Sequence, residues 1–420
     1  MLTFLRFFLF LLPFQFALSP TENIDLPIVR VLAVGIILVW MAKGLFNRQL
    51  SLGWNVQTGA LLSFWFVLGL SMSVAEEVSW ALRKMLFLMS FFPLYFVWRE
   101  EVGHHQARAF FLVEAFVFGA ALSAAIGILQ VVLQFFIPVE TLFSWWTSHV
   151  LPFFLGHGFA GAVAEYPSLL VNLSGRTVMR ASALFPDPHM HAFYLGLALP
   201  LAFFFVWQKR TWLWWNLSLC ILIADLLTFS RGAYLGFGLA LIGGGFLFGS
   251  KLSLGAKKAV LLGIGGVILL LWVPNPIGER FWSGFSAEDG SVAARLALYQ
   301  EAGQHIGERP WLGVGIGNYP LAVKPTALPR EPIYVHDLWL DIAVETGILG
   351  LICFGAFFFS ALSSVYRAWK TTGHAFYLAL FGSLVLFFGH SLVETPLFSV
   401  QVFPAWLFLV ALSRLPYANE

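Results

Sequence analysis

Long apolar segments recur along this 420-residue sequence, and they constrain the fold more than any other feature. A helix needs about 20 apolar residues to cross the hydrocarbon core of a bilayer, where its backbone polar groups must be hydrogen-bonded within the helix. Hydrophobic residues make up 59% of the chain and charged residues 11%. The sequence predicts an all-α polytopic membrane protein, a single integral membrane domain over residues 1–420, with about 12 transmembrane helices. The segments are approximately residues 2–18, 27–46, 54–74, 79–98, 109–137, 188–207, 212–229, 233–249, 258–274, 337–362, 374–393 and 396–413.

Basic residues are distributed unevenly between the connections of these segments. Residues 2–18 also resemble a signal peptide, but no small-residue cleavage motif follows, so we interpret them as the first transmembrane helix. With successive connections on alternate sides, one side holds only Arg30, Arg83, Lys84 and Arg231 in its short connections. Lys and Arg accumulate on cytoplasmic loops, so the richer side is predicted to be cytoplasmic, together with both termini. That side holds Arg6, Lys43, Arg48, Arg99, Arg108, Lys209, Arg210, Lys251, Lys257, Lys258, Arg367, Lys370 and Arg414.

Two long connections, residues 138–187 and 275–336, both fall on the extracytoplasmic side of this arrangement. In the second, Ser291 is a suitable cap for a helix running to about His305, whose apolar residues recur at helical spacing. This helix is expected either on the membrane surface as a lid or packed within a small loop domain. The glycine-rich GVGIGN that follows lacks the context of a nucleotide-binding loop, so we interpret it as a turn.

Residues 331–350, EPIYVHDLWLDIAVETGILG, combine a histidine with acidic residues at the start of an apolar segment. Asp337, Asp341 and Glu345 recur every four residues below His336 and should share one helix face. A carboxylate in hydrocarbon costs several kcal/mol unless it is paired or faces water. The stripe therefore indicates a protein-walled cavity in which the acids orient His336, or else a helix cap followed by interhelical salt bridges.

Several arginines on the predicted outer side are candidates for binding an anion. Arg231 lies between two apolar segments, and Arg295 lies on the predicted loop helix one turn before Tyr299. The guanidinium group is always charged and presents a planar fork of donors that suits phosphate oxygens. Arg180 is a further candidate. The alternatives are snorkelling from a helix end for Arg231, a solvated side chain for Arg295, and contact with lipid headgroups for Arg180.

Two further polar sites fall on the same side. His390 and Glu394 are four residues apart, so they are expected to touch within one helix, in a structural or supporting role. His189 and His191 point in different directions at a spacing of two residues, which disfavours a metal site. No metal, cofactor, nucleotide or nucleic acid is expected.

A cavity at the outer leaflet lined by arginines and a histidine suits a substrate with a lipid tail and a diphosphate head. The guanidinium groups would stabilise charge on a leaving diphosphate while His336 takes a proton from an incoming hydroxyl. These residues alone leave glycosyl transfer and hydrolysis of a lipid phosphate both open.

Four motifs in order distinguish the sequence further: FSRGAYLG, SVAARLALYQEA, RPWLGVGIGNYP and VHDLWLDIAVETGILG. Together they resemble the O-antigen ligase and polymerase superfamily of bacterial envelope glycosyltransferases, over about residues 170–400. The most specific element is a histidine and a polar residue, then a leucine, then Glu-x-Gly-x-x-Gly. Its residues here are His336, Asp337, Leu340, Glu345, Gly347 and Gly350.

The resemblance implies a twelve-helix, GT-C-like fold with a large periplasmic loop between helices 9 and 10. It also implies an undecaprenyl-diphosphate-linked glycan donor and metal-independent, inverting transfer at the periplasmic face of the bacterial inner membrane. His336 resembles the catalytic histidine of the family, and Arg231 and Arg295 resemble its diphosphate-binding arginines. Glu394 falls where many members have an acidic residue.

The motifs do not separate members of the superfamily. We favour an O-antigen ligase, which transfers the glycan to a lipid A–core acceptor. A polymerase of the same superfamily is the first alternative, and a transporter or flippase of lipid-linked sugars is the second. The transporter would need polar residues across the whole bilayer, whereas the unusual charges of this sequence cluster outward.

Overall fold

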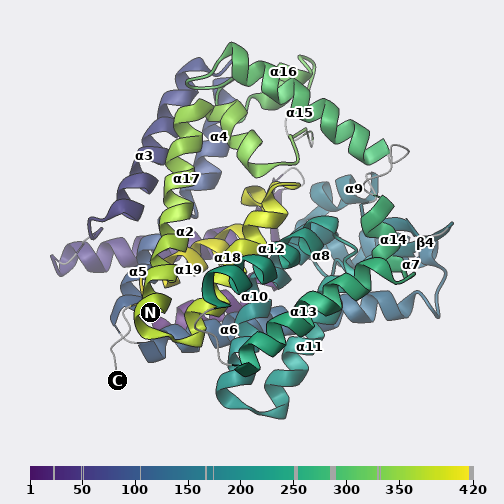
Figure 1. Cartoon of the computed structure of the whole chain (residues 1–420). Helices are drawn as coiled ribbons and strands as arrows, with labels where there is room; N and C mark the ends of the chain where they lie inside the picture. Colours follow the sequence, from purple (N-terminus) through teal and green to yellow (C-terminus); the bar gives the residue numbers. More distant parts are fainter. Residues whose placement is uncertain are drawn as a thin grey trace.

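The computed structural model describes residues 1–21, 24–48, 50, 52–104, 106–165, 168–173, 175–249, 254–283, 290–328, 331 and 333–415, and they form a mostly helical protein (Figure 1). Lys251, assigned to the cytoplasmic side, and the side chain of the expected cap Ser291 lie outside this description. The helices up to residue 165 are α1 Leu2–Leu11, η1 Leu12–Phe14, α2 Ile28–Phe46, α3 Val56–Ser71, η2 Met72–Val74, α4 Val78–Met89, α5 Leu94–His104, α6 Gln106–Leu133, α7 Val139–Trp145, η3 Trp146–Val150, α8 Leu151–Leu155 and α9 His157–Glu165. The later helices are α10 Pro188–Lys209, α11 Trp212–Leu227, α12 Arg231–Phe248, α13 Leu254–Trp272, α14 Pro276–Ser283, α15 Gly290–Glu308, α16 Tyr319–Val323, α17 Leu338–Thr372, α18 Ala375–Ser391, η5 Pro396–Phe398 and α19 Val402–Leu412.

Two short antiparallel strand pairs add to the helices, which the all-α prediction did not include. They are β1 Ala17–Thr21 with β2 Ile24–Pro27, and β3 Leu170–Leu173 with β4 Arg176–Met179. Gly175 has a φ of 80° at the turn between β3 and β4, and its N–H donates to the side chain of Asn172 at 2.9 Å. The predicted loop 138–187 thus contains the helices α7, η3, α8 and α9 as well as this hairpin.

Seven of the described helical segments are long and apolar enough to cross a membrane, and the pair Leu261–Trp272 and Pro276–Ser283, bent by 76°, would make an eighth. These segments confirm a mostly helical, multi-pass membrane protein. The count of twelve stays a prediction, because four further predicted segments form helices that are apolar but shorter. These are Leu2–Phe14, Trp212–Leu227, Ala375–Ser391 and Val402–Leu412.

Helix α10 lies at the centre of the bundle. It contacts α6, α11, α12, α18 and α19, and most of its side chains are buried (Figure 1). Asp187 caps its N-terminus by accepting a hydrogen bond from the N–H of Met190 at 2.9 Å, and Pro188 occupies its first turn, where no N–H is needed. The N-terminal end of α10 lies beside the start of α12 and the end of α18, since His189 and His390 both contact the hydroxyl of Ser230, at 2.9 and 3.0 Å. The candidate site lies at these ends.

Helix α17 is broken at Gly347, whose backbone has φ 67° and ψ −172°. In an unbroken helix the N–H of Ile348 would bond to the carbonyl of Val344. Here the carbonyl of Val344 accepts from the N–H of Val314 at 2.8 Å, and the N–H of Ile348 donates to the carbonyl of Pro310 at 2.8 Å. The loop 309–318 therefore satisfies the groups that the break exposes. A Cβ at Gly347 would lie 2.2 Å from the backbone of Trp311, so only glycine fits.

Helix α15 is the helix that the sequence predicted within residues 275–336. It packs against α17, and in Figure 1 it lies with α16 at one end of α3, α4 and α17. The helix is therefore packed against the rest of the protein, and its position relative to a membrane surface stays a prediction. Its apolar residues join a small buried cluster with Val314, Tyr319, Val335 and Val344, to which α15 contributes Tyr299, Ala302 and Ile306.

Candidate functional site

His336 lies immediately before α17 in a strained conformation. Its φ of 60° is in the left-handed region, which residues other than glycine seldom adopt and which is enriched at functional sites. The next residue, Asp337, caps α17 by accepting hydrogen bonds from the N–H groups of Trp339 at 2.8 Å and Leu340 at 2.9 Å. Asp337 is therefore a helix cap, as in the alternative interpretation of the stripe as a cap followed by interhelical salt bridges.

A buried carboxylate holds the imidazole of His336. The Nδ1 atom lies 3.0 Å from Oε1 and 3.3 Å from Oε2 of Glu394. The His336 side chain is 28% exposed and that of Glu394 only 4%. An ionised carboxylate can only accept a hydrogen bond, so Nδ1 carries the proton in this pair and Nε2 is the basic nitrogen.

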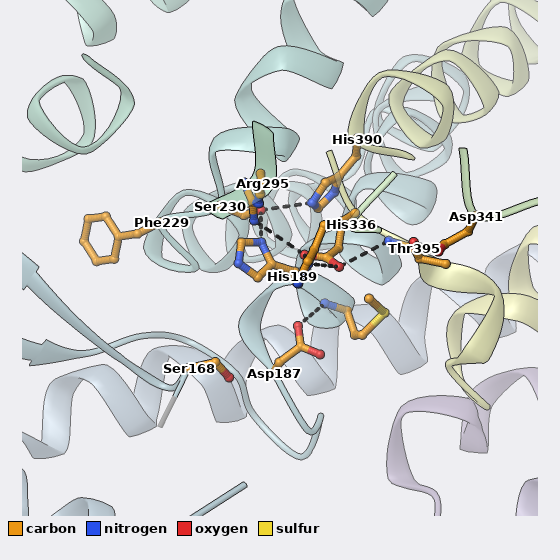
Figure 2. Close-up of polar contacts among 12 residues, drawn as sticks. Ser168, Asp187, His189, Phe229, Ser230, Arg295, His336, Asp341, His390 and Thr395 are labelled. Atoms are coloured by element: carbon orange, nitrogen blue, oxygen red, sulfur yellow. Dashed lines mark hydrogen bonds and ion pairs between the residues drawn. The ribbon is translucent and has the colours of Figure 1, made fainter. Parts of the chain in front are cut away.

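Two residues of α15 approach this pair, as Figure 2 shows for Arg295. An Nη2 atom of Arg295 lies 3.7 Å from Oε2 of Glu394, with the Arg295 side chain 21% exposed. The hydroxyl of Tyr299 donates to the backbone carbonyl of His336 at 3.3 Å. Burial, followed by the charge of Asp337, raises the pKa of Tyr299 to about 12, so the hydroxyl keeps its proton at neutral pH. The structure thus brings Arg295, Tyr299, His336 and Glu394 together.

The acids lower on α17 have other partners than His336. Glu345 forms an ion pair with Lys84 of α4, and Asp341 is hydrogen-bonded to Thr395 and to the backbone of Val335. Both line a small cavity between α3, α4 and α17. The carboxylate that contacts the imidazole is therefore Glu394, 58 residues away in the chain, and not one of the acids that the sequence interpretation placed below His336.

His390 belongs to a second polar cluster. Its Nε2 lies 3.0 Å from the hydroxyl of Ser230, and Nδ1 of His189 lies 2.9 Å from the same oxygen (Figure 2). The sequence predicted that His390 would contact Glu394, whereas His390 contacts Ser230 and Glu394 contacts His336. Helix α18 ends at Ser391, so the four-residue spacing does not continue on one helix face and each residue takes another partner. Ser230 thus connects α10, α18 and the start of α12.

Arg180 is buried and bound to backbone. Its Nε donates to the carbonyl of Thr228 at 2.7 Å, Nη1 to Ser168 at 3.1 Å, and Nη2 to Phe229 at 3.4 Å. Burial, followed by the charge of Arg280, lowers its pKa to about 9. These contacts fix the turn between α11 and α12, which is a structural role in place of the predicted contact with substrate.

Arg231 begins α12 directly after Ser230 and is partly exposed. Its charge and that of Arg280 on α14 both act on Arg180, so each of the two guanidinium groups lies within electrostatic reach of Arg180. The sequence interpretation missed Arg280, because no motif or spacing in residues 275–283 distinguishes it. It also missed Ser230 and Thr395, although Ser230 directly precedes Arg231 and Thr395 directly follows Glu394.

Among the residues that the structure describes, no three His, Cys, Asp or Glu side chains are grouped as the ligands of a metal ion would be. The polar groups that do converge are a histidine with its carboxylate and one arginine, Arg295. This set can move a proton and stabilise an anion.

Comparison with known proteins identifies the region that carries these groups. Residues 217–355 match the sequence profile of a family described as O-Antigen ligase, and this region includes Arg231, Arg295 and His336. Glu394 lies beyond the match. A search of curated proteins found no match. The resemblance inferred from the motifs is confirmed over residues 217–355, where the chain is similar to the O-antigen ligase family.

Proposed function

We propose that this protein transfers a glycan from a lipid-diphosphate carrier to an acceptor hydroxyl, with His336 as the general base. The observation that carries this proposal is the contact of Nδ1 of His336 with the buried carboxylate of Glu394 at 3.0 Å. It directs the basic Nε2 away from Glu394, on a side chain that is partly exposed. A general base must reach the proton that it removes, and this arrangement leaves one nitrogen for that purpose.

In the proposed step, the acceptor hydroxyl oxygen attacks the anomeric carbon of the donor sugar and forms the new glycosidic bond. The bond from this carbon to the diphosphate oxygen breaks, and the diphosphate leaves with the electron pair. His336 takes the hydroxyl proton at Nε2, and Glu394 stabilises the imidazolium that results. Attack opposite the leaving group inverts the configuration at the anomeric carbon.

Arginines would provide the positive charge that the leaving diphosphate requires. Arg295 lies beside Glu394. Arg231, at the start of α12, and Arg280, on α14, both lie near Arg180. The guanidinium fork can bind two phosphate oxygens at once, which a lysine cannot. Because the arginine side chains can stabilise the charge of the leaving diphosphate, we propose that transfer needs no metal ion. Activity should persist in excess chelator, and a loss that a divalent cation restores would overturn this part.

The family match supports a lipid-linked glycan as donor, and we propose the undecaprenyl diphosphate form. The proposed acceptor is a sugar hydroxyl of lipid A–core, which makes the protein an O-antigen ligase. We further propose twelve spanning helices in the bacterial inner membrane, with cytoplasmic termini and the site on the periplasmic face. The uneven distribution of Lys and Arg supports this orientation.

Reconstitution of the purified protein in liposomes tests the proposal. With the lipid-diphosphate-linked glycan and lipid A–core both present, a ligase joins them. With the donor alone, a polymerase lengthens the glycan on its carrier. A transporter would move the donor across the bilayer without forming a new glycosidic bond, and this result would contradict the proposal. In a deletion strain, unligated long glycan on its carrier indicates a ligase, whereas single repeats on the core indicate a polymerase.

A further inference from the structure

Asp341 connects the two segments that carry His336 and Glu394. Its Oδ1 accepts a hydrogen bond from the backbone N–H of Val335 at 2.9 Å. Its Oδ2 accepts one from the hydroxyl of Thr395, and Figure 2 shows these two side chains side by side. Val335 directly precedes His336, and Thr395 directly follows Glu394. Asp341 and Thr395 are both buried. One carboxylate therefore fixes the immediate neighbours of both members of the pair.

Neither member of the pair is held by regular secondary structure. His336 precedes α17 with a φ of 60°, a conformation that costs on the order of 1 kcal/mol or more for a residue other than glycine. Glu394 lies between the end of α18 at Ser391 and the start of η5 at Pro396. Their relative position therefore depends on contacts between the two segments, and the hydrogen bonds of Asp341 are such contacts.

We propose that Asp341 and Thr395 are positioning residues, which hold Glu394 against Nδ1 of His336 through their hydrogen bonds to the neighbouring residues. This inference rests on the proposed function, because it assigns these residues to the proton transfer by His336. A misplacement of about 1 Å in a reacting group can cost about 100-fold in rate. Loss of this connection should therefore lower turnover more than donor binding.

Conservative substitutions separate a geometric role from an electrostatic one. Thr395→Val keeps the shape of the side chain and removes its hydroxyl, whereas Thr395→Ser keeps the hydroxyl. Asp341→Asn keeps an oxygen for the N–H of Val335 and gains an amide that can donate to the Thr395 oxygen. Asp341→Ala removes both connections. If position alone matters, the Asn and Ser variants retain function and the Ala and Val variants do not.

A buried hydroxyl elsewhere gives a matched control. Ser413 lies just beyond the C-terminal end of α19 and accepts a hydrogen bond from the Gln57 side chain at 2.9 Å. Thr395 precedes η5 and the N-terminal end of α19, so the two hydroxyls lie at opposite ends of that segment. Ser413→Ala removes a comparable buried hydrogen bond and should leave turnover unchanged.

The experiment measures kcat and donor KM for these variants in liposomes, with the thermal midpoint and donor binding as checks of folding. We expect Thr395→Val and Asp341→Ala to lower kcat about 10- to 100-fold with little change in KM, and Thr395→Ser and Asp341→Asn to stay close to wild type. The inference would be overturned if Thr395→Val turned over as fast as Ser413→Ala. It would also be overturned if Asp341→Asn folded but was inactive. If a His336 variant kept full turnover, the proposed function itself would fail instead.

Discussion

Two histidines at the same end of the bundle have opposite surroundings. His336 is partly exposed, contacts the carboxylate of Glu394, and lies with its ring 4.2 Å from that of Tyr334. His390 is 2% exposed, contacts the hydroxyl of Ser230, and stacks on Phe193 at 3.6 Å. A partly exposed imidazole with a carboxylate partner can exchange protons with a substrate. A fully buried one between a hydroxyl and a ring is suited to holding α10, α12 and α18 together.

Matched substitutions of the two histidines should give the largest difference. We expect His336→Gln to lower kcat by about 10²- to 10⁴-fold without unfolding the protein, since general base catalysis contributes about this much. His390→Gln should lower the thermal midpoint and affect turnover far less. Turnover and melting of both variants in the same detergent or liposomes test this. Equal losses of turnover in folded samples would remove the distinction between the two sites.

Glu394→Gln should have the next largest effect. The amide can donate as well as accept, so it no longer fixes the proton on Nδ1 of His336, nor does it stabilise an imidazolium by charge. We expect kcat to fall by about 100-fold, the lower end of what proton transfer by a positioned side chain contributes, with donor binding largely retained. Binding of a labelled donor to the purified variant provides the control. Wild-type turnover in this variant would mean that His336 works without its carboxylate.

Two arginines allow the same comparison for binding. Arg295→Lys keeps the charge but loses the fork, so we expect donor KM to rise about tenfold, which is about 1.4 kcal/mol. Arg180→Lys should leave KM unchanged and destabilise the protein by about 1–3 kcal/mol, because it loses hydrogen bonds to backbone carbonyls. Kinetics and thermal melting of both variants test this. A raised KM in Arg180→Lys at unchanged stability would restore the predicted role in substrate binding.

Asp337→Asn should have the smallest effect on turnover, since Asn caps a helix as well as Asp does. Burial raises the pKa of Asp337 from 3.8 to about 6. A carboxyl with a raised folded-state pKa contributes stability that is complete below about pH 4 and is lost as pH rises through about 6. The Asn variant lacks this titration, so its stability relative to wild type should rise by about 3 kcal/mol over that interval. Melting curves at several pH values would show it.

The apolar segments were predictable because length and hydropathy are local properties. The helix-starting position of His336 was predictable as well, from the polar residues that precede an apolar run. The break in α17 was not, because it depends on the loop 309–318 supplying hydrogen bonds to Val344 and Ile348. The two strand pairs were also missed, since each strand has only four or five residues.

The partners of the site residues were less predictable than the residues themselves. The sequence selected Glu394 but expected it to touch His390, because spacing along a helix was the only available guide. The observed partner, His336, lies on another segment and depends on how α17 and α18 pack. Arg180 was expected to bind an anion or to contact lipid headgroups, and only the structure shows that it is hydrogen-bonded to three backbone carbonyls. Spacing predicts neighbours within a helix and gives no information on neighbours between helices.

Replacement of His336 by glycine tests the central claim most directly. Glycine adopts a φ of 60° without strain, so His336→Gly removes the imidazole and relieves the backbone at the same time. Transfer of the lipid-diphosphate-linked glycan by this variant would be measured in liposomes, with and without added imidazole. We predict no transfer by the variant alone and a partial recovery that increases with imidazole concentration. Wild-type transfer without imidazole would contradict the role of His336 as the base.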